Sequence, residues 1–158
     1  PKEMRRKLKI QEGDQVEIVL NKEGKVDIKK YLPLGDKYEL LQDISDTLSQ
    51  NLGFKILISD KEKIIIDTSN NKDLLNENIN SDMLEYIKTR ENYISKDTKG
   101  KRILVERSEI VAIAFFPIIV EADSIGMVYI LPSLMPKQLE LSDINIIKFV
   151  LDFLKNYL

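Results

Sequence analysis

Cysteine and histidine are both absent from the 158 residues of this chain. Without cysteine, the chain can form no disulfide and offers no thiolate as a metal ligand or nucleophile. Without histidine, it can contain no Ser-His-Asp triad, no imidazole base and no His-ligated zinc. Carboxylates and lysines remain available for acid–base chemistry, but the sequence shows no convergent set of them. We therefore expect a protein that is not an enzyme and that needs no metal or cofactor.

The chain also lacks a long hydrophobic run and a large excess of charge. The longest uncharged apolar run, residues 110–120, contains Pro117. It falls well short of the roughly 20 residues that a membrane-spanning helix needs. Lys and Arg number 24, Asp and Glu number 26, and 43% of the residues are apolar, which is an ordinary mixture for a folded protein. With no signal peptide visible, we expect a cytoplasmic protein without a membrane partner.

The charge is nevertheless distributed unevenly along the chain. Residues 1–31 carry nine basic and six acidic residues, whereas residues 32–158 carry 15 basic and 20 acidic ones. The change coincides with a Pro- and Gly-containing segment that breaks regular structure. We therefore predict a first domain at residues 1–32, a linker at residues 33–36 and a second domain at residues 37–158.

The first domain is predicted to be small and incomplete. Met4 and Leu8 lie four residues apart, as on one face of a short helix. Alternating apolar residues predict strands at 16–20 and 26–28, joined by a tight turn at 21–24. About six core residues are too few to fold alone. Because the sequence starts at a proline rather than a methionine, we expect residues to be missing upstream, and partner strands must come from there or from another chain.

The second domain is predicted to be α+β, with a mostly antiparallel sheet flanked by helices. Hairpin turns link neighbouring strands, and helical spacing of apolar residues marks the two ends of the domain. The expected elements are a helix at 38–52 that ends at Gly53, strands at 54–59 and 64–66, a helix capped by Ser81 and carrying Met83, Leu84, Ile87 and Ile94, strands at 103–106, 110–120 and 125–131, and a final helix capped by Ser142.

The final helix is apolar around more of its circumference than one contact requires. Ile144, Ile147 and Leu154 belong to one face, and Phe149 and Phe153 extend the apolar surface beyond it. Packing on one sheet face needs an apolar stripe only about 100° wide. Two interpretations remain open: the helix is deeply buried in its own domain, or its second face forms a homodimer contact, which we favour.

A specific motif opens the first domain. The pattern P-x-E-M-R-R-x-L-x-I spans residues 1–10, and E-G-D follows at residues 12–14. Over residues 1–31 the chain resembles the AbrB-type swapped-hairpin DNA-binding domain, in which two chains exchange hairpins to form one dimeric domain. Only the last residue of that family's opening L-G-R-x-V-I-P segment is present, as Pro1.

Four basic side chains are the candidate DNA contacts. From spacing alone, the basic helix face has two interpretations, a DNA contact surface or a solvated face. The resemblance implies that Arg5 and Arg6 face double-stranded DNA, where their planar donor groups suit phosphates and base edges. Lys2 and Lys9 are expected to add phosphate contacts or long-range attraction.

The second domain resembles a GAF domain on two short segments. Residues 116–119 (F-P-I-I) match the family's hydrophobic-Pro strand, and residues 124–128 (S-I-G-M-V) match its I-G-x-V strand. The resemblance implies a pocket between the sheet and the connecting segment at residues 70–99. The sequence is compatible with an unidentified small-molecule ligand there and equally with a filled core.

The order of the two domains resembles a family of transcription regulators that act during spore formation in endospore-forming bacteria. The resemblance implies a nucleoid-associated protein of the forespore. Swapped hairpins would join two chains, and GAF-like helices would join two such dimers into a homotetramer. The alternative is a ligand-sensing or purely structural dimerisation module that does not bind DNA.

Overall fold

The computed structural model describes residues 1–97 and 99–158. The chain forms two compact units, an N-terminal unit (Pro1–Asp36) and a C-terminal unit (Lys37–Leu158).

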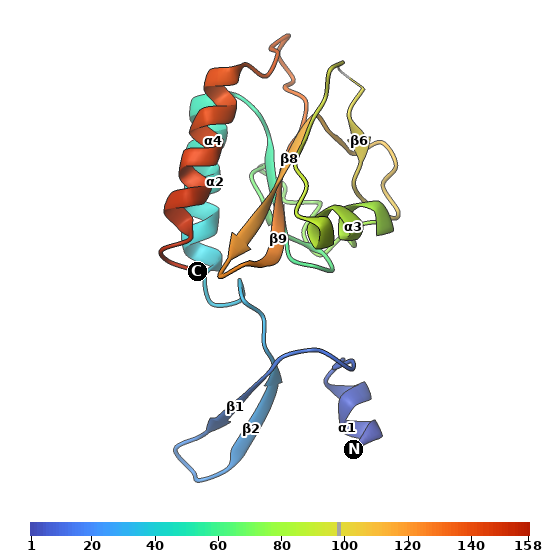
Figure 1. The fold of residues 1–158 in the computed structure, drawn as a ribbon, viewed down its shortest axis with the longest axis vertical. Helices are drawn as coiled ribbons and strands as arrows, with labels where there is room; N and C mark the ends of the chain where they lie inside the picture. Colours follow the sequence, from blue (N-terminus) through green and yellow to red (C-terminus); the bar gives the residue numbers. More distant parts are fainter. Residues whose placement is uncertain (98) are drawn as a thin grey trace. The chain divides into compact units, whose positions relative to one another are not determined.

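The N-terminal unit consists of one short helix and one hairpin (Figure 1). Helix α1 (Lys2–Lys7) precedes strands β1 (Val16–Leu20) and β2 (Val26–Lys30), which pair antiparallel with Ile18 opposite Ile28. The turn between the strands is closed by Asn21, whose side-chain oxygen accepts the backbone N–H groups of residues 23 and 25 at 3.0 and 2.9 Å. The short helix and hairpin that the sequence predicts are therefore both present.

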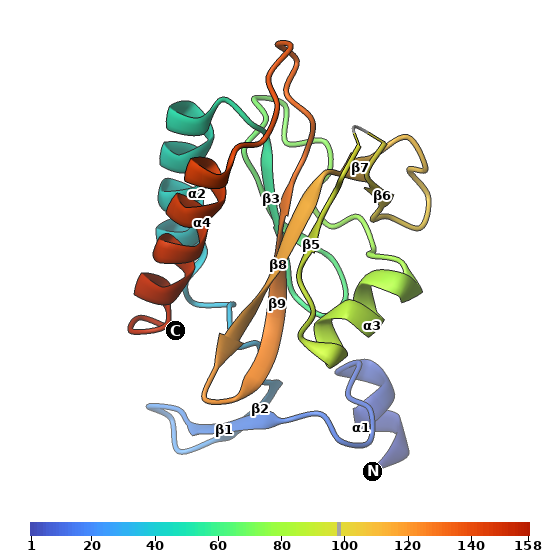
Figure 2. The ribbon, with the colours of Figure 1, turned by 45° about the horizontal axis from the view of Figure 1, so that its top comes forward.

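The C-terminal unit is a five-stranded antiparallel sheet between helices, which confirms the α+β class (Figures 1 and 2). The strand order is β4-β3-β9-β8-β5, and β6 and β7 form a separate two-stranded sheet. Helices α2 and α4 lie side by side on one face of the large sheet, and α3 lies on the other face (Figure 2). The elements are α2 (Tyr38–Leu52), β3 (Ile56–Ser59), β4 (Ile64–Asp67), α3 (Ser81–Thr89), β5 (Tyr93–Ile94), β6 (Lys101–Arg102), β7 (Val111–Ala112), β8 (Ala114–Val120), β9 (Asp123–Ile130) and α4 (Leu141–Leu154).

Two helix boundaries differ from the sequence predictions at their N-termini. Asn80, not Ser81, caps α3, because its side-chain oxygen accepts the Met83 N–H at 3.0 Å. The cap of α4 is Glu140 rather than Ser142. A reciprocal pair of bonds between Glu140 and Asp143 closes this first turn, and the Glu140 N–H donates to the Asp143 carboxylate at 2.9 Å.

Helix α3 is also shorter than predicted at its C-terminus. Arg90 adopts a left-handed conformation with φ 59°, which ends the helix at Thr89. Ile94, which the sequence pattern assigned to this helix, therefore lies on the edge strand β5 and pairs with Ala114.

One predicted strand lies elsewhere in the chain, and another is divided in two. The strand expected at residues 103–106 is found at Lys101–Arg102 instead, and Ile103 and Leu104 are buried in the core. The single strand expected at 110–120 is divided at Ile113 into β7 and β8. The division has a clear cause, since the chain pairs with β6 before this residue and with β9 after it.

The core between the large sheet and α3 is filled by side chains. The segment that connects β4 to α3 contributes Leu74 and Ile79, and α3 itself contributes Met83 and Ile87. These side chains pack with residues of the sheet, among them Tyr129, which has no exposed surface. The space directly between the large sheet and α3 therefore holds protein side chains.

Candidate DNA-binding surface

Helix α1 presents its basic side chains without burying any residue. Pro1 stands at its N-cap, where the missing N–H is no loss. The helix ends because Lys9 takes a left-handed conformation with φ 53°, and the Ile10 N–H donates to the Arg5 carbonyl at 2.8 Å. Arg5 and Arg6 lie in the last turn, where positive charge complements the partial negative charge of the exposed carbonyls.

The structure brings the four predicted DNA contacts to one short segment. Lys2 lies three and four positions before Arg5 and Arg6, so these three residues share a helix face. Lys9 follows just beyond the helix end, and all four residues are exposed. Within the described residues, none of their side chains forms a hydrogen bond or an ion pair. Their charges are therefore not neutralised within the chain.

Asp14 connects the segment after α1 to the hairpin, a role that the sequence analysis did not identify. Its carboxylate accepts the Gln11 N–H at 2.8 Å and lies 3.2 Å from the Lys30 ammonium. Both charged side chains are half-buried, so the ion pair is partly shielded from water. The sequence showed Asp14 only as a turn residue, because its distance to Lys30 depends on the hairpin register.

The hairpin lacks a core of its own. Ile18, Leu20 and Val26 are 66%, 70% and 60% exposed, although their side chains are apolar. Leu20 pairs with Val26, and Ile18 lies two residues away on the same strand face. Of residues 1–36, all of which the structure describes, Leu34 alone is buried. A single copy of this unit thus leaves an apolar strand face uncovered.

Helix α4 likewise has an uncovered apolar stripe on the C-terminal unit. Its inner face is buried through Ile144, Ile147 and Leu154. The stripe consists of Ile146, Phe149 and Phe153, with Phe149 71% exposed, and Tyr157 continues it just beyond the helix. The rings of Phe153 and Tyr157 lie 5.0 Å apart.

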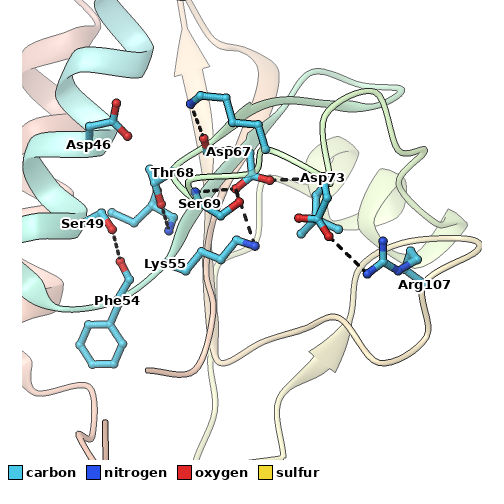
Figure 3. Close-up of polar contacts among 12 residues, drawn as sticks. Asp46, Ser49, Phe54, Lys55, Asp67, Thr68, Ser69, Asp73 and Arg107 are labelled. Atoms are coloured by element: carbon cyan, nitrogen blue, oxygen red, sulfur yellow. Dashed lines mark hydrogen bonds and ion pairs between the residues drawn. The ribbon is translucent and has the colours of Figure 1, made fainter. Parts of the chain in front are cut away.

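An extensive polar cluster in the C-terminal unit surrounds the buried Asp67 (Figure 3). Its carboxylate accepts the N–H and hydroxyl of Ser69 at 2.8 and 2.6 Å and the Leu74 N–H at 3.2 Å. The ammonium of Lys55 lies 3.7 Å away. These partners satisfy both oxygens, so Asp67 braces the segment after β4 and is not left free to bind a ligand.

Two further kinds of site were sought among the described residues, a metal-binding group and a membrane-spanning helix. Across residues 1–97 and 99–158, no group of three or more Asp or Glu side chains is placed to hold a metal ion. In the same residues, no helix is both long enough and apolar enough to cross a membrane.

An exposed basic helix in one unit and a filled α+β second unit are the parts expected of a two-domain transcription regulator. Comparison with known families supports both parts. Residues 38–157 match the family described as stage V sporulation protein T C-terminal, transcription factor. Residues 1–34 match the family described as antidote-toxin recognition MazE, bacterial antitoxin.

The chain belongs to the stage V sporulation protein T family. It is 35% identical over 133 residues to stage V sporulation protein T of Bacillus subtilis (strain 168), a match that covers 82% of this chain and 74% of that protein. The resemblance to regulators of spore formation is thereby confirmed.

Solved structures confirm the GAF-like fold of the C-terminal unit. The cofactor-binding GAF domain of the nutrient sensor CodY from Clostridium difficile has a TM-score of 0.53 at 11% identity, covering 76% of this chain and 90% of that one. Residues 122 to 287 of a methyl-accepting chemotaxis protein give a TM-score of 0.58 at 16% identity, covering 73% and 84%. At these identities the likeness concerns the fold alone.

Proposed function

We propose that this protein regulates transcription during spore formation by binding double-stranded DNA through Arg5 and Arg6, assisted by Lys2 and Lys9. In this proposal residues 1–32 form the DNA-binding domain, residues 33–36 a linker, and residues 37–158 a GAF-like domain for assembly. The protein acts at the nucleoid of the forespore. The observation that carries the proposal is the group of four exposed cations without an internal partner on and beside α1.

DNA is the partner that fits this group best. Guanidinium groups present a planar fork of donors that matches phosphates and guanine edges. Two copies of the N-terminal unit, joined by exchanged hairpins, would cover the exposed face that includes Ile18 and Leu20. Such a dimer doubles the number of cations on one DNA-binding surface.

The C-terminal unit serves as the assembly module in this proposal. Its filled core favours a structural role over a ligand held between the sheet and α3. The exposed stripe of α4 supplies the apolar surface for a second self-contact. Two different self-contacts in each chain would produce a homotetramer.

Fluorescence anisotropy with a duplex DNA across a salt series tests the DNA-binding proposal. The variant carrying Arg5→Ala and Arg6→Ala should bind at least about tenfold more weakly. For two copies of each arginine, the slope of log Kobs against log[salt] should fall by up to about four units, since each phosphate contact contributes about 0.9.

The matched control removes the same charge from the C-terminal unit through Lys61→Ala and Lys88→Ala, both of which are exposed positions. The control should retain most of its affinity and the original slope. Equal losses in the two variants would mean that only net charge matters, and the assignment of the DNA surface to α1 would be wrong.

A further inference from the structure

Residues of α3, β6 and the segments beside them line a cleft of about 640 Å³. This volume lies within the range of about 300–1,000 Å³ that is usual for small-molecule sites. Helix α3 lies on the opposite side of the sheet from α2 and α4 (Figure 2). The cleft lies outside the filled core and borders it at Met83. A ligand in this cleft would therefore need no rearrangement of the core.

One wall of the cleft is acidic. Asp82, Glu85 and Thr89 lie three or four positions apart, which places them on one face of α3 together with Tyr86. Glu91 follows directly after the helix and lines the same cleft. This wall thus presents three carboxylates around an aromatic ring.

The β6 side of the cleft is basic, and aromatic rings hold its lysine in position. The Lys101 ammonium lies 5.1 Å from the centre of the Tyr93 ring and 6.0 Å from that of Tyr86. Both rings pack on the buried Phe115, with centroids 5.0 and 4.8 Å from it. Such cation–π contacts orient an ammonium but do not neutralise its charge. Arg102 adds a second cation to the wall.

The backbone fixes the location of this basic wall. Gly100, with φ +65°, precedes β6, and a Cβ atom there would lie only 2.5 Å from the carbonyl oxygen of Ala112. Only glycine allows so close an approach of the two strands. The position of Lys101 beside α3 therefore follows from the chain path rather than from a flexible surface loop.

The two walls do not neutralise each other. In the part of the chain that the structure describes, no hydrogen bond or ion pair joins the carboxylates of Asp82, Glu85 or Glu91 to the two cations of β6. Opposite charges that line one cleft without pairing can both bind a molecule that carries both signs. A simple anion or cation would match only one of the two walls.

We propose that this cleft binds a short peptide with free termini, of two or three residues. Its ammonium group lies against Asp82 and Glu85, its carboxylate binds Lys101 and Arg102, and a central side chain packs on Tyr86. A peptide of this length suits the volume better than a single small ion. The proposal goes beyond DNA binding, and its test does not depend on DNA.

Isothermal titration calorimetry of the full chain tests the proposal with three probes. These are alanyl-phenylalanyl-alanine with free ends, its N-acetylated form and its C-terminal amide. The free peptide should bind, and capping either end should weaken binding about tenfold or more, because each end loses charge-assisted hydrogen bonds. Binding of all three peptides with equal affinity would overturn the recognition of both ends, and no binding at millimolar peptide would overturn the site.

Variants of the cleft test which residues bind each end of the peptide. Lys101→Met should weaken the free peptide about tenfold but leave the amide nearly unchanged, since the amide already lacks the carboxylate. Glu85→Gln, a change at an exposed position, should weaken the free peptide about tenfold and leave the acetylated peptide nearly unchanged. Lys88→Met, outside the cleft, is the control and should change none of the affinities. Equal effects of a variant on all three peptides would contradict the assignment of the ends.

Discussion

Ser59 and Tyr129 form a polar pair inside the core of the C-terminal unit. Their hydroxyl oxygens lie 3.0 Å apart, and both side chains are fully buried. Burial raises the pKa of the Tyr129 phenol, and the hydrogen bond with Ser59 offsets only part of this rise. The neutral phenol is therefore a requirement of the folded state.

Tyr129→Phe should lower the free energy of unfolding by about 1–3 kcal/mol, because the Ser59 hydroxyl loses its buried partner. Urea unfolding measures the loss, and adding Ser59→Ala to this variant should recover part of it.

The contribution of the Tyr129 phenol to stability is fully present below its unfolded pKa of about 10 and is lost as pH rises further. The native chain should thus lose stability above about pH 10 more steeply than Tyr129→Phe, and parallel pH profiles would contradict this.

The roles of some residues could be predicted from the sequence, and those of others could not. The basic character of Arg5 and Arg6 is visible in a short motif, and their resemblance to a DNA-contacting family depends on neighbours along the chain. The Ser59–Tyr129 bond joins residues 70 positions apart. It depends on β3 lying beside β9, a strand order that no local pattern specifies.

Helix α1 makes little contact with a core, so its orientation depends on the polar link through Asp14. Asp14→Ala removes both the acceptor for the Gln11 N–H and the ion pair with Lys30, and should weaken duplex DNA binding about three- to tenfold. The salt slope should stay unchanged, because no phosphate contact is removed. Asp14→Asn keeps an acceptor for the N–H group and should recover part of the affinity, as anisotropy would show. A reduced slope for Asp14→Ala would instead mean that DNA contacts are lost.

Element types were easier to predict than element ends. Helices α2 and α4 were predictable because their apolar residues recur at helical spacing over several turns. The residue that caps α3 was not predictable, since Asn80 and Ser81 are adjacent and equally suitable by residue type. The division between β7 and β8 at Ile113 depends on a change of pairing partner, which apolar character alone does not reveal.

Assembly of the whole protein depends, in our proposal, on two apolar surfaces that belong to different units. The hairpin face includes Ile18 and Leu20, and the α4 stripe includes Phe149 and Phe153. Because the surfaces are distinct, disrupting one should leave the other self-contact in place. The expected species are therefore a tetramer for the native chain and a dimer when the α4 contact is lost.

Phe149→Glu combined with Phe153→Glu should halve the mass measured by sedimentation equilibrium, because charged side chains would have to be desolvated in the α4 contact. Both positions are exposed in the single chain, so the C-terminal unit should still fold. Gln50→Glu combined with Asn51→Glu adds the same charge at exposed positions of α2 and should leave the mass unchanged. The dimer formed by the Phe149→Glu, Phe153→Glu protein should still bind duplex DNA, since its hairpins and α1 helices are intact. A Phe149→Glu, Phe153→Glu protein that remains tetrameric would exclude the α4 stripe as the second contact, whereas dissociation to monomers would show that the hairpins alone do not hold two chains together.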